Sequence, residues 1–551
     1  MYVNRHPQWQ PYEINPEYGK KVAYFSMEYA IDQSLKIYSG GLGFLAGSHM
    51  RSAYDLKQNV IGIGILWKYG YYDQVWNSDH VMEPKFVKKH YSFLQDTGII
   101  FDITIHDAPV YVKAYYLHPE TFGTAPMFFL STDIPENDYI SRTITHKLYD
   151  SNLAAKIAGS ILLGVGGAKL LDILGLEPEV YHMNEGHAVP LVFYLYSKFR
   201  DIEEVRKRMV FTTHTPEKAG NEEHSIKLLE EMSFFHNIPL NEVKRIARLD
   251  GDTLNYTLTA LRFAKISNGV SQIHGQVSNE MWGGNEGISK IISITNAQNK
   301  RFWKDDVLEQ ALQQDNNDLL LARKKELKKQ LFEVVADQAG KLFDPNILTL
   351  VWARRFAGYK RAALLLKNID RFIELVSRAH EPIQVIWAGK PYPEDKLGIE
   401  IFNYIAWRIE GLNRCAILTG HELKLSALLK KGSDLWLNNP IPPREASGTS
   451  GMTAAMNGSV NFSIADGWFP EFARHGENSF VIPQSHASYE EERDYNEAQC
   501  IYHLLEHEII PVYYRDPGRW AHIMKQGMRE VTPQFDSDRM ATEYYQKLYN
   551  Y

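Results

Sequence analysis

The stretch ILTLVWARRFAGYKR (residues 347–361) joins a short apolar run directly to a cluster of basic residues and a glycine turn. Runs rich in isoleucine and valine, bounded by turn signals, are typical of strands buried on both faces of a parallel sheet. Other stretches follow the same pattern: NVIGIGILW (59–67), MVFTTHT (209–215), IISITN (291–296), PIQVIWAGK (382–390) and CAILTG (415–420). Because these runs alternate with helical patterns, the sequence predicts an α/β architecture.

The chain length favours two domains. A chain of 551 residues is too long for one ordinary core. Between residues 300 and 345 the pattern changes to a charged, helix-forming stretch, after which strand–helix units restart. We therefore predict a Rossmann-like domain over residues 1–299, a helical connection over 300–345 and a second Rossmann-like domain over 346–551. We expect the final helices to return to the first domain, and a ligand cleft to lie between two doubly wound sheets.

Composition narrows the class of protein. A formal net charge of −7 argues against general binding to nucleic acid or to an anionic membrane. The only cysteines are Cys415 and Cys500, which suggests a reducing compartment, and neither belongs to a zinc-binding pattern. The N-terminus lacks the apolar segment of a secretory signal, and the apolar stretch at 157–176 is interrupted by Lys169 and Asp172. We expect a cytoplasmic protein with no membrane partner, in which residues 157–176 form a buried helix.

Glycines and histidines mark candidate binding segments in the N-terminal half. YSGGLGFLAG (38–47) is a glycine-rich turn entering a helix, which could cradle an anion or sugar hydroxyls, although most such segments are simply tight turns. FTTHTP (211–216) places His214 at the end of a predicted strand, where a ligand site is plausible. YHMNEGHA (181–188) groups four polar side chains without metal-ligand spacing, so we expect no metal there and favour a structural polar network or a cleft lining.

Two segments of the C-terminal half are suited to an anion. Within 353–361 the cations Arg354, Arg355, Lys360 and Arg361 crowd one strand-to-helix junction, where guanidinium groups and a helix start both favour phosphate. EASGTSGMTAAMNG (445–458) offers a carboxylate, small hydroxyl and glycine residues, and then a helix start. Neither segment is a Walker loop or a dinucleotide fingerprint. Residue chemistry alone therefore indicates an enzyme that handles a phosphorylated sugar.

Taken in order, the motifs resemble those of the α-glucan (glycogen/maltodextrin) phosphorylases in their short bacterial form. The matching segments are YFSMEY, YSGGLGFLAG, GYYDQ, HMNEGHA, FTTHTP, GVSQIHGQVS, ARRFAGYKR, DLWLNNP and EASGTSGM…NG…DGW, over roughly residues 22–468. The resemblance implies a GT-B fold, with a glucan- and glucosyl-binding N-terminal domain and a phosphate- and cofactor-binding C-terminal domain. It implies retaining glucosyl transfer between the non-reducing end of an α-1,4-glucan or maltodextrin and phosphate, releasing glucose 1-phosphate. Many relatives form homodimers, so a homodimer is possible.

The resemblance assigns roles to individual residues. In the N-terminal half, Gly40, Gly41 and Leu42 match the loop beside the glucosyl group. His214 matches a histidine whose backbone carbonyl faces the sugar, and Asn296 matches a sugar-hydroxyl ligand. Fixed cations would stabilise the charge that develops against a phosphate leaving group.

In the C-terminal half, the resemblance assigns Glu445 to the sugar hydroxyls and Arg355 and Lys360 to the substrate phosphate. We expect Ser447 to offer a further donor to the substrate. The remaining matches are Arg354, Gly448 and Thr449, which surround the phosphate of pyridoxal 5′-phosphate in the family.

Thr453 departs from the family pattern. It occupies the position of the lysine that forms an imine with pyridoxal phosphate, and threonine has no amine. Further differences are TNAQN (295–299), AGNEE (219–223) and LTGHE (418–422). Three interpretations stay open: a phosphorylase that holds its cofactor noncovalently, a glucosyltransferase that uses UDP- or ADP-glucose without the cofactor, and a glucan-binding pseudoenzyme.

Overall fold

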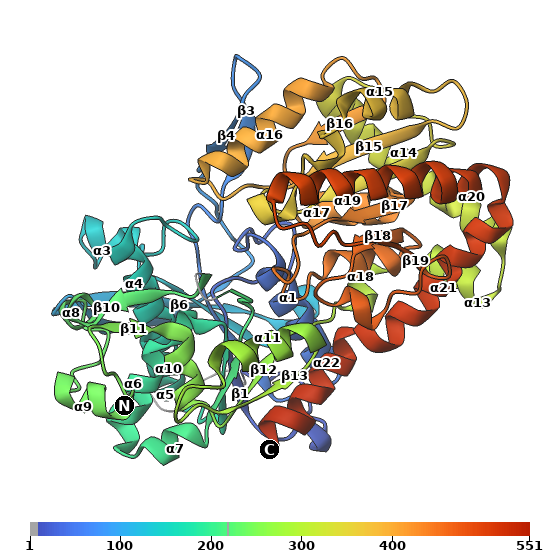
Figure 1. Ribbon diagram of the computed structural model, residues 1–551. Helices are drawn as coiled ribbons and strands as arrows, with labels where there is room; N and C mark the ends of the chain where they lie inside the picture. The colour runs from blue at the N-terminus through green and yellow to red at the C-terminus, as the bar shows by residue number, and fades with distance from the viewer. Residues whose placement is uncertain (1–8, 218–219) are drawn as a thin grey trace. The chain divides into compact units, whose positions relative to one another are not determined.

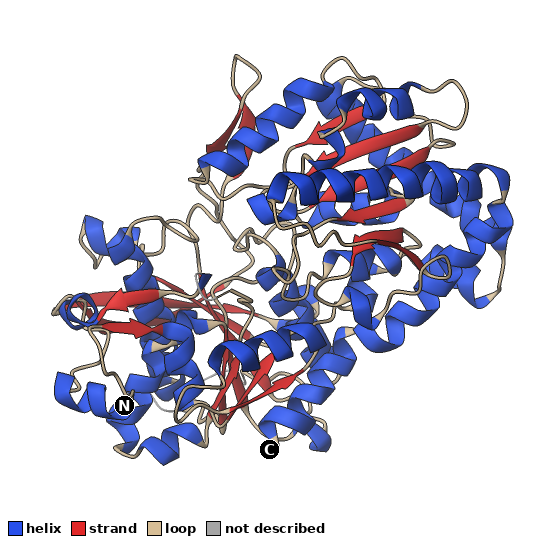
Figure 2. Cartoon of the chain, in the orientation of Figure 1, coloured by secondary structure: helices blue, strands red, loops and turns tan. Residues whose placement is uncertain are grey.

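The computed structural model describes residues 9–217 and 220–551, which form two compact units. Of the described residues, unit 1 contains 9–71, 86–217, 220–299 and 537–551, and unit 2 contains 72–85 and 300–536. In both units helices run along the strands of a mainly parallel sheet (Figure 2). The predicted α/β fold with two Rossmann-like parallel sheets is confirmed. Of the predicted segments, AGNEE begins at residue 219, and residues 218–219 lie outside the described residues.

Unit 1 is built on a nine-stranded sheet. Its strands lie in the order β13 (Lys290–Ser293), β12 (Ile266–Gly269), β9 (Met209–Thr212), β8 (Val180–Asn184), β1 (Val22–Phe25), β2 (Val60–Ile65), β7 (Met127–Ser131), β6 (Ala108–Leu117) and β5 (Gln95–Ile105). The strands from β13 to β7 are parallel, and β7, β6 and β5 form an antiparallel edge. Strands β1 and β2 are buried at every position, as expected for strands covered on both faces.

Most helices of unit 1 lie between its strands along the chain, and α22 lies near the C-terminus (Figure 1). They are α1 (Gly41–Asp55), α2 (Pro119–Phe122), α3 (Tyr139–Thr143), α4 (Leu153–Ile161), α5 (Gly167–Ile173), α6 (Pro190–Phe199), α7 (Ile202–Arg206), α8 (Ile226–Glu231), α9 (Leu240–Ile246), α10 (Tyr256–Phe263), α11 (Gln272–Trp282) and α22 (Ser537–Tyr544). A small hairpin, β10 (Glu223–Ser225) and β11 (Thr253–Asn255), lies outside the main sheet. Residues 153–173 form one continuous helical stretch whose length and composition could cross a membrane, but most of it is buried inside the protein.

Unit 2 has a six-stranded, entirely parallel sheet. The order is β16 (Cys415–Leu418), β15 (Ile383–Ala388), β14 (Leu348–Ala353), β17 (Leu435–Asn438), β18 (Val460–Ile464) and β19 (Ser479–Ile482). Numbered along the chain this is 3-2-1-4-5-6, the arrangement of dinucleotide-binding folds. The chain therefore reverses its direction of winding between β14 and β17.

The helices of unit 2 include the charged segment that precedes its first sheet strand. They are α12 (Lys300–Trp303), α13 (Asp306–Gln313), α14 (Asn317–Ala339), α15 (Ile369–Ser377), α16 (Lys396–Ile409), α17 (Leu423–Gly432), α18 (Ser450–Ala455), α19 (Glu490–Leu504), α20 (Ile510–Arg515) and α21 (Pro517–Phe535). Residues 300–345, expected to form a connection between domains, are part of unit 2 because α14 packs against α17 and β16. Within α14, Leu327, Leu331 and Val335 are buried.

A second hairpin of unit 2 comes from the N-terminal half of the sequence. It consists of β3 (Asp73–Trp76) and β4 (Met82–Lys85). The backbone N–H of Met82 donates to Asn403 Oδ1 on α16 at 2.8 Å, and Trp76 contacts the ring of Phe402. The predicted boundary at residue 299 omits this insertion, which long-range packing alone creates.

Candidate functional site

The basic segment 354–361 follows the carboxyl end of β14, and the loop 439–449 follows the carboxyl end of its neighbour β17. These ends lie at the point where the winding of the unit 2 sheet reverses. Ligands of open α/β sheets bind at such a point, because the loops on its two sides diverge. Strand order thus brings together two segments that are about ninety residues apart in sequence.

Glu445 binds two cations of the basic segment. Its Oε2 accepts a hydrogen bond from Lys360 Nζ at 2.8 Å and another from Arg354 Nη2. All three side chains are largely buried. Burial alone would raise the pKa of the Glu445 carboxyl, but Lys360 and Arg354, with a smaller effect of Arg355, lower it to about 2. At neutral pH the cluster therefore contains one carboxylate and an excess of positive charge.

A second carboxylate, that of Asp466, holds the backbone at Glu445 in place. Asp466, two residues after β18, accepts the backbone N–H of Glu445 at Oδ2 (2.9 Å) and that of Gly467 at Oδ1 (2.8 Å). Burial and the nearby charge of Glu445 raise the pKa of Asp466 to about 7, although its backbone hydrogen bonds and Arg354 act in the opposite direction. Asp466 belongs to the DGW segment of the sequence, for which no role of this residue was predicted.

The small residues after Glu445 form a tight turn. Gly448 has φ +73°, a conformation that side chains rarely adopt, and Gly467 lies so close that a Cβ there would be 2.2 Å from the carbonyl oxygen of Ser447. The Ser447 hydroxyl is buried and has no hydrogen-bond partner among the described residues. Thr449 precedes α18 without a side-chain capping bond. The predicted helix start is a helix of only six residues, so its dipole contributes little to anion binding.

Thr453 is buried and bonds back to the preceding turn of its own helix. Its side chain is fully buried, and Oγ1 donates to the Ser450 carbonyl oxygen at 3.0 Å. Asn457 Nδ2 in turn donates to the Thr453 carbonyl oxygen at 2.8 Å. The residue therefore acts as a helix-packing side chain and offers no group to an aldehyde.

The phosphate end of this site, formed by Arg354 and Ser447, nevertheless fits the phosphate group of pyridoxal phosphate. Arg354 Nη1 is buried and makes no hydrogen bond within the part of the chain that the structure describes. An unmatched buried guanidinium N–H is costly, and a phosphate oxygen is the partner that its geometry favours. Together with the Ser447 hydroxyl, it makes a donor set for a phosphate group.

Arg361 is not part of this donor set. It binds the carbonyl oxygens of Asn439 and Pro440, each at 2.9 Å, and pairs with the carboxylates of Asp494 and Glu497. It therefore anchors the loop after β17 to α19. This structural arginine directly follows the candidate ligand Lys360 in the sequence.

In unit 1, His214 follows the carboxyl end of β9, next to residues at the carboxyl end of β8. His214 Nε2 lies 2.7 Å from Asn184 Oδ1, and Glu185 Oε2 accepts the backbone N–H of His214 at 2.7 Å. Glu185 has φ +70°, a strained backbone for a non-glycine residue, of the kind that concentrates at functional sites. Burial, with smaller effects of His274 and His187, lowers the pKa of His214 to about 3. His214 is therefore neutral at pH 7 and donates from Nε2 to the amide oxygen.

The glycine loop is held by a carboxylate that sequence reasoning did not single out. Glu28 Oε2 accepts the backbone N–H groups of Ser39 (2.5 Å) and Gly40 (3.1 Å), and Tyr149 donates to its Oε1 at 2.7 Å. A Cβ added at Gly40 or Gly41 would have no described atom within 4 Å. These two glycines are therefore not required by internal crowding. Leu42 follows them in the first turn of α1.

Asn296 carries an unused acceptor. It follows β13, its backbone N–H donates to the Val270 carbonyl oxygen at 3.0 Å, and its buried Oδ1 has no partner among residues 9–217 and 220–551. Such an amide oxygen fits a ligand hydroxyl. His182, in contrast, is saturated by Tyr549 and Thr212 and belongs to the core. The described residues contain no group of three His, Cys, Asp or Glu side chains placed to hold a metal ion.

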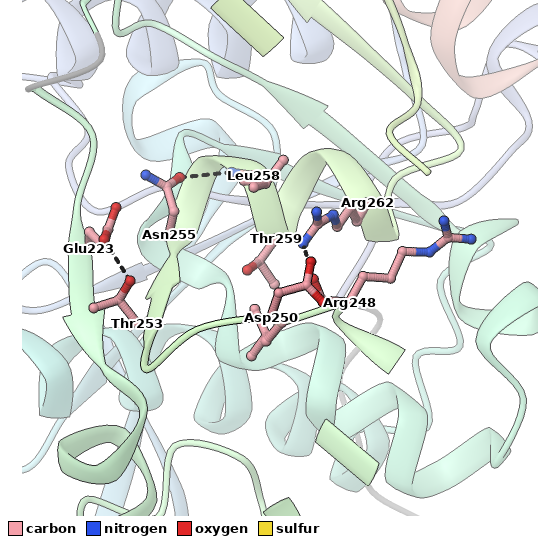
Figure 3. A pocket seen from close by; sticks show the side chains of 9 residues that line it. Glu223, Arg248, Asp250, Thr253, Asn255, Leu258, Thr259 and Arg262 are labelled. Atoms are coloured by element: carbon pink, nitrogen blue, oxygen red, sulfur yellow. Dashed lines mark hydrogen bonds between the residues drawn. The ribbon is translucent and has the colours of Figure 1, made fainter. Parts of the chain in front are cut away.

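A separate pocket of about 210 Å³ lies in unit 1 beside the β10–β11 hairpin (Figure 3). Thr253 donates to Glu223 there at 2.7 Å, and Asn255 caps α10 through the backbone N–H of Leu258 at 2.9 Å. Arg262 Nη1 donates to the carbonyl oxygens of Ala247 and Arg248. These polar groups hold the local fold together, and none of the predicted site residues lines the pocket.

Comparison with known proteins identifies the family of the chain. The carbohydrate phosphorylase family model matches residues 253–502. An uncharacterized protein of Methanocaldococcus jannaschii is 47% identical, over 96% of this chain and 100% of its own length. The maltodextrin phosphorylase of Thermococcus litoralis is 32% identical, over 100% of this chain and 73% of that protein, and the glycogen phosphorylase of Aquifex aeolicus is 30% identical, over 100% and 88%. The chain belongs to the carbohydrate phosphorylase family and is a glycosyltransferase of the hexosyltransferase class.

Proposed function

We propose that this protein is an α-glucan phosphorylase that moves a glucosyl unit from the non-reducing end of an α-1,4-glucan to inorganic phosphate, releasing glucose 1-phosphate. The observation that carries the proposal is the cluster at the winding reversal of unit 2. There Glu445 holds Lys360 and Arg354, and Arg354 keeps a buried N–H group for an anion. The similarity to a maltodextrin phosphorylase and a glycogen phosphorylase supports the same substrates.

The chain's own residues account for binding and charge stabilisation. Lys360 and Arg355 would bind the phosphate that attacks or leaves the anomeric carbon, and fixed cations stabilise the negative charge on that phosphate in the transition state. Glu445 orients Lys360 through the 2.8 Å ion pair. In unit 1, Asn296 Oδ1 would accept a glucosyl hydroxyl, and the backbone carbonyl of His214 would face the sugar ring.

The residues at the phosphate end would also hold the family's cofactor. Arg354, Ser447, Gly448 and Thr449 would bind the phosphate of pyridoxal 5′-phosphate, which, when bound, supplies a phosphate group that can exchange a proton with the substrate phosphate. Asp466 keeps the loop that carries these residues in place through the backbone N–H groups of Glu445 and Gly467.

The test is the phosphorolysis of maltoheptaose by the purified protein, with inorganic phosphate and with or without added pyridoxal phosphate. We expect glucose 1-phosphate to form, at a rate that rises with added cofactor. Elongation of maltoheptaose from UDP- or ADP-glucose, without any effect of pyridoxal phosphate, would replace the proposal with a nucleotide-sugar transferase. Maltoheptaose binding with neither reaction would identify a glucan-binding protein and refute the proposal.

A further inference from the structure

The β3–β4 hairpin of unit 2 places a buried amide at the carboxyl ends of two sheet strands. Gln74, on β3, uses both ends of its amide: Nε2 donates to the Gly389 carbonyl oxygen at 2.9 Å, and Oε1 accepts the backbone N–H of Gly420 at 3.0 Å. Gly389 directly follows β15, and Gly420 lies two residues after β16. Gln74 therefore bridges the two strand ends and takes up backbone groups that a ligand at this edge would use.

Tyr72, just before β3, ties the hairpin to the same two loops. Its hydroxyl donates to the Pro391 carbonyl oxygen at 2.7 Å, and its own carbonyl oxygen accepts a hydrogen bond from Lys390 Nζ at 2.7 Å. Lys390 also pairs with Glu422 Oε1, in the loop after β16, at 3.0 Å. Tyr72, Lys390 and Glu422 are all buried. The hairpin is thus an integral part of this edge of the sheet.

These contacts adjoin the phosphate end of the candidate site. Arg354 follows β14, the neighbour of β15, and its backbone N–H donates to the Ala388 carbonyl oxygen at 3.1 Å. A Cβ added at Gly389 would lie 1.7 Å from the Arg354 carbonyl oxygen, so the segment that anchors Gln74 packs directly against the Arg354 backbone. Glu445 reaches Arg354 from the loop after β17, the other neighbour of β14. The phosphate end therefore has Glu445 on one side and the hairpin on the other.

A nucleotide would need the side that the hairpin occupies. In sheets with the strand order of unit 2, the phosphates of a nucleotide lie at the turn after the first strand, and an acidic residue near the end of the second strand binds the ribose. In this chain the segment after the second strand, β15, binds the hairpin instead, through Gly389, Lys390 and Pro391. A nucleoside there would have to displace Tyr72 and Gln74, and breaking their buried hydrogen bonds is costly.

We propose that Tyr72 and Gln74 are specificity residues: they fill the nucleoside position beside the phosphate site, so that the chain binds a sugar phosphate and rejects a nucleoside diphosphate sugar. The inference rests on the proposed function, since that function places the substrate phosphate at Arg355 and Lys360. It gives a role to the GYYDQ segment (70–74) of the sequence. Selectivity against nucleotides is then a property of a hairpin that comes from the N-terminal half of the chain.

The test compares the binding of glucose 1-phosphate with that of ADP-glucose and UDP-glucose. Isothermal titration calorimetry of the full-length protein, without added pyridoxal phosphate, gives the three dissociation constants. We expect both nucleotide sugars to bind at least about tenfold more weakly than glucose 1-phosphate, the cost of breaking one or two buried hydrogen bonds. Gln74→Ala vacates part of the nucleoside position and should reduce that ratio. Gln74→Met, which keeps the bulk, and Asp79→Ala, at the exposed tip of the hairpin, should preserve it. Circular dichroism and thermal melting check that each variant is folded.

Wild-type protein that binds ADP-glucose or UDP-glucose as tightly as glucose 1-phosphate would overturn the inference without recourse to any variant. An unchanged ratio in folded Gln74→Ala would do the same. Phosphorolysis of maltoheptaose is measured on the same samples with pyridoxal phosphate added. Phosphorolysis together with tight nucleotide-sugar binding would refute the inference and leave the proposed function standing. Rejection of nucleotide sugars without phosphorolysis would support the inference and refute the function. Binding of none of the three compounds would refute both.

Discussion

Two adjacent basic residues, Lys360 and Arg361, have different roles in this structure. Lys360 points to Glu445, whereas Arg361 is buried among carbonyl oxygens and the carboxylates of Asp494 and Glu497. We predict that Lys360→Met lowers kcat/KM for phosphorolysis by about 100- to 1,000-fold, the cost of one lost charge-stabilising contact, while Glu445 keeps Arg354 as a partner. Arg361→Met should instead destabilise the fold by about 3–5 kcal/mol, because buried carboxylates lose their partner. Kinetics and urea unfolding of both variants would separate the roles, and near-normal turnover in Lys360→Met would remove it from the site.

The protonation of Asp466 should make the rate of phosphorolysis depend on pH. With its pKa raised to about 7, chiefly by burial, it gains a proton as the pH falls through neutrality and then holds the backbone N–H groups of Glu445 and Gly467 less strongly. We predict that kcat/KM rises as the pH increases through about 7. Asp466→Asn should flatten that rise, while leaving glucan binding measurable. A variant whose pH–rate profile still rises near neutrality would show that another group causes the transition.

At the scale of elements, the C-terminal segment is a structural part of unit 1. Tyr544, Tyr545 and Tyr549 are fully buried, and the Tyr549 hydroxyl lies 2.8 Å from His182 Nδ1. Each large buried side chain contributes about 1.5–3 kcal/mol, so we predict that deleting residues 537–551 costs more than about 5 kcal/mol, on the order of a whole domain's stability. Tyr549→Phe should cost only about 1–3 kcal/mol, through the unmatched histidine nitrogen. Urea unfolding measures both, and an unchanged midpoint in the deletion variant would contradict the assignment.

The same elements show what could be predicted from the sequence. The strands β2, β9, β13, β14, β15 and β16 follow from short apolar runs bounded by turns, and their helical connections indicate the parallel sheets. The cations of 354–361 and Glu445 could be selected because they follow strand ends. The roles of Glu28 and Asp466 could not, since a carboxylate that accepts backbone N–H groups leaves no spacing pattern. The hairpin 72–85 escaped prediction because its place in unit 2 depends on contacts with α16, more than three hundred residues away.

At the scale of the molecule, burial of neutral histidines makes stability depend on pH. Burial lowers the pKa of His49 and His214 to about 3 and that of His274 to about 4, all in unit 1, and that of His421 to about 3 in unit 2. Above the unfolded value of 6.5, these rings are neutral in both states, and the stability is fully present. As the pH falls toward the folded values, the unfolded chain binds more protons, and stability is lost. The raised pKa values of Glu28, Glu185 and Asp466 oppose this trend, but these three groups are fewer than the four histidines.

His49 allows this dependence to be tested at one position. Both ring nitrogens are buried without a partner among the described residues, and the ring packs between Tyr24 and Tyr544 at centroid distances of 4.8 and 5.2 Å. We predict that His49→Phe, which keeps an aromatic ring but cannot take up a proton, reduces the loss of unfolding free energy between pH 6.5 and 4.5 by about 1.4 kcal/mol per pH unit. Urea unfolding at several pH values measures that slope. His224→Phe serves as the control, because His224 Nε2 has a partner, Glu222 Oε2 at 3.0 Å, whereas the ring nitrogens of His49 have none among the described residues. Parallel pH profiles for wild type and His49→Phe would mean that the buried imidazole is not a source of acid instability.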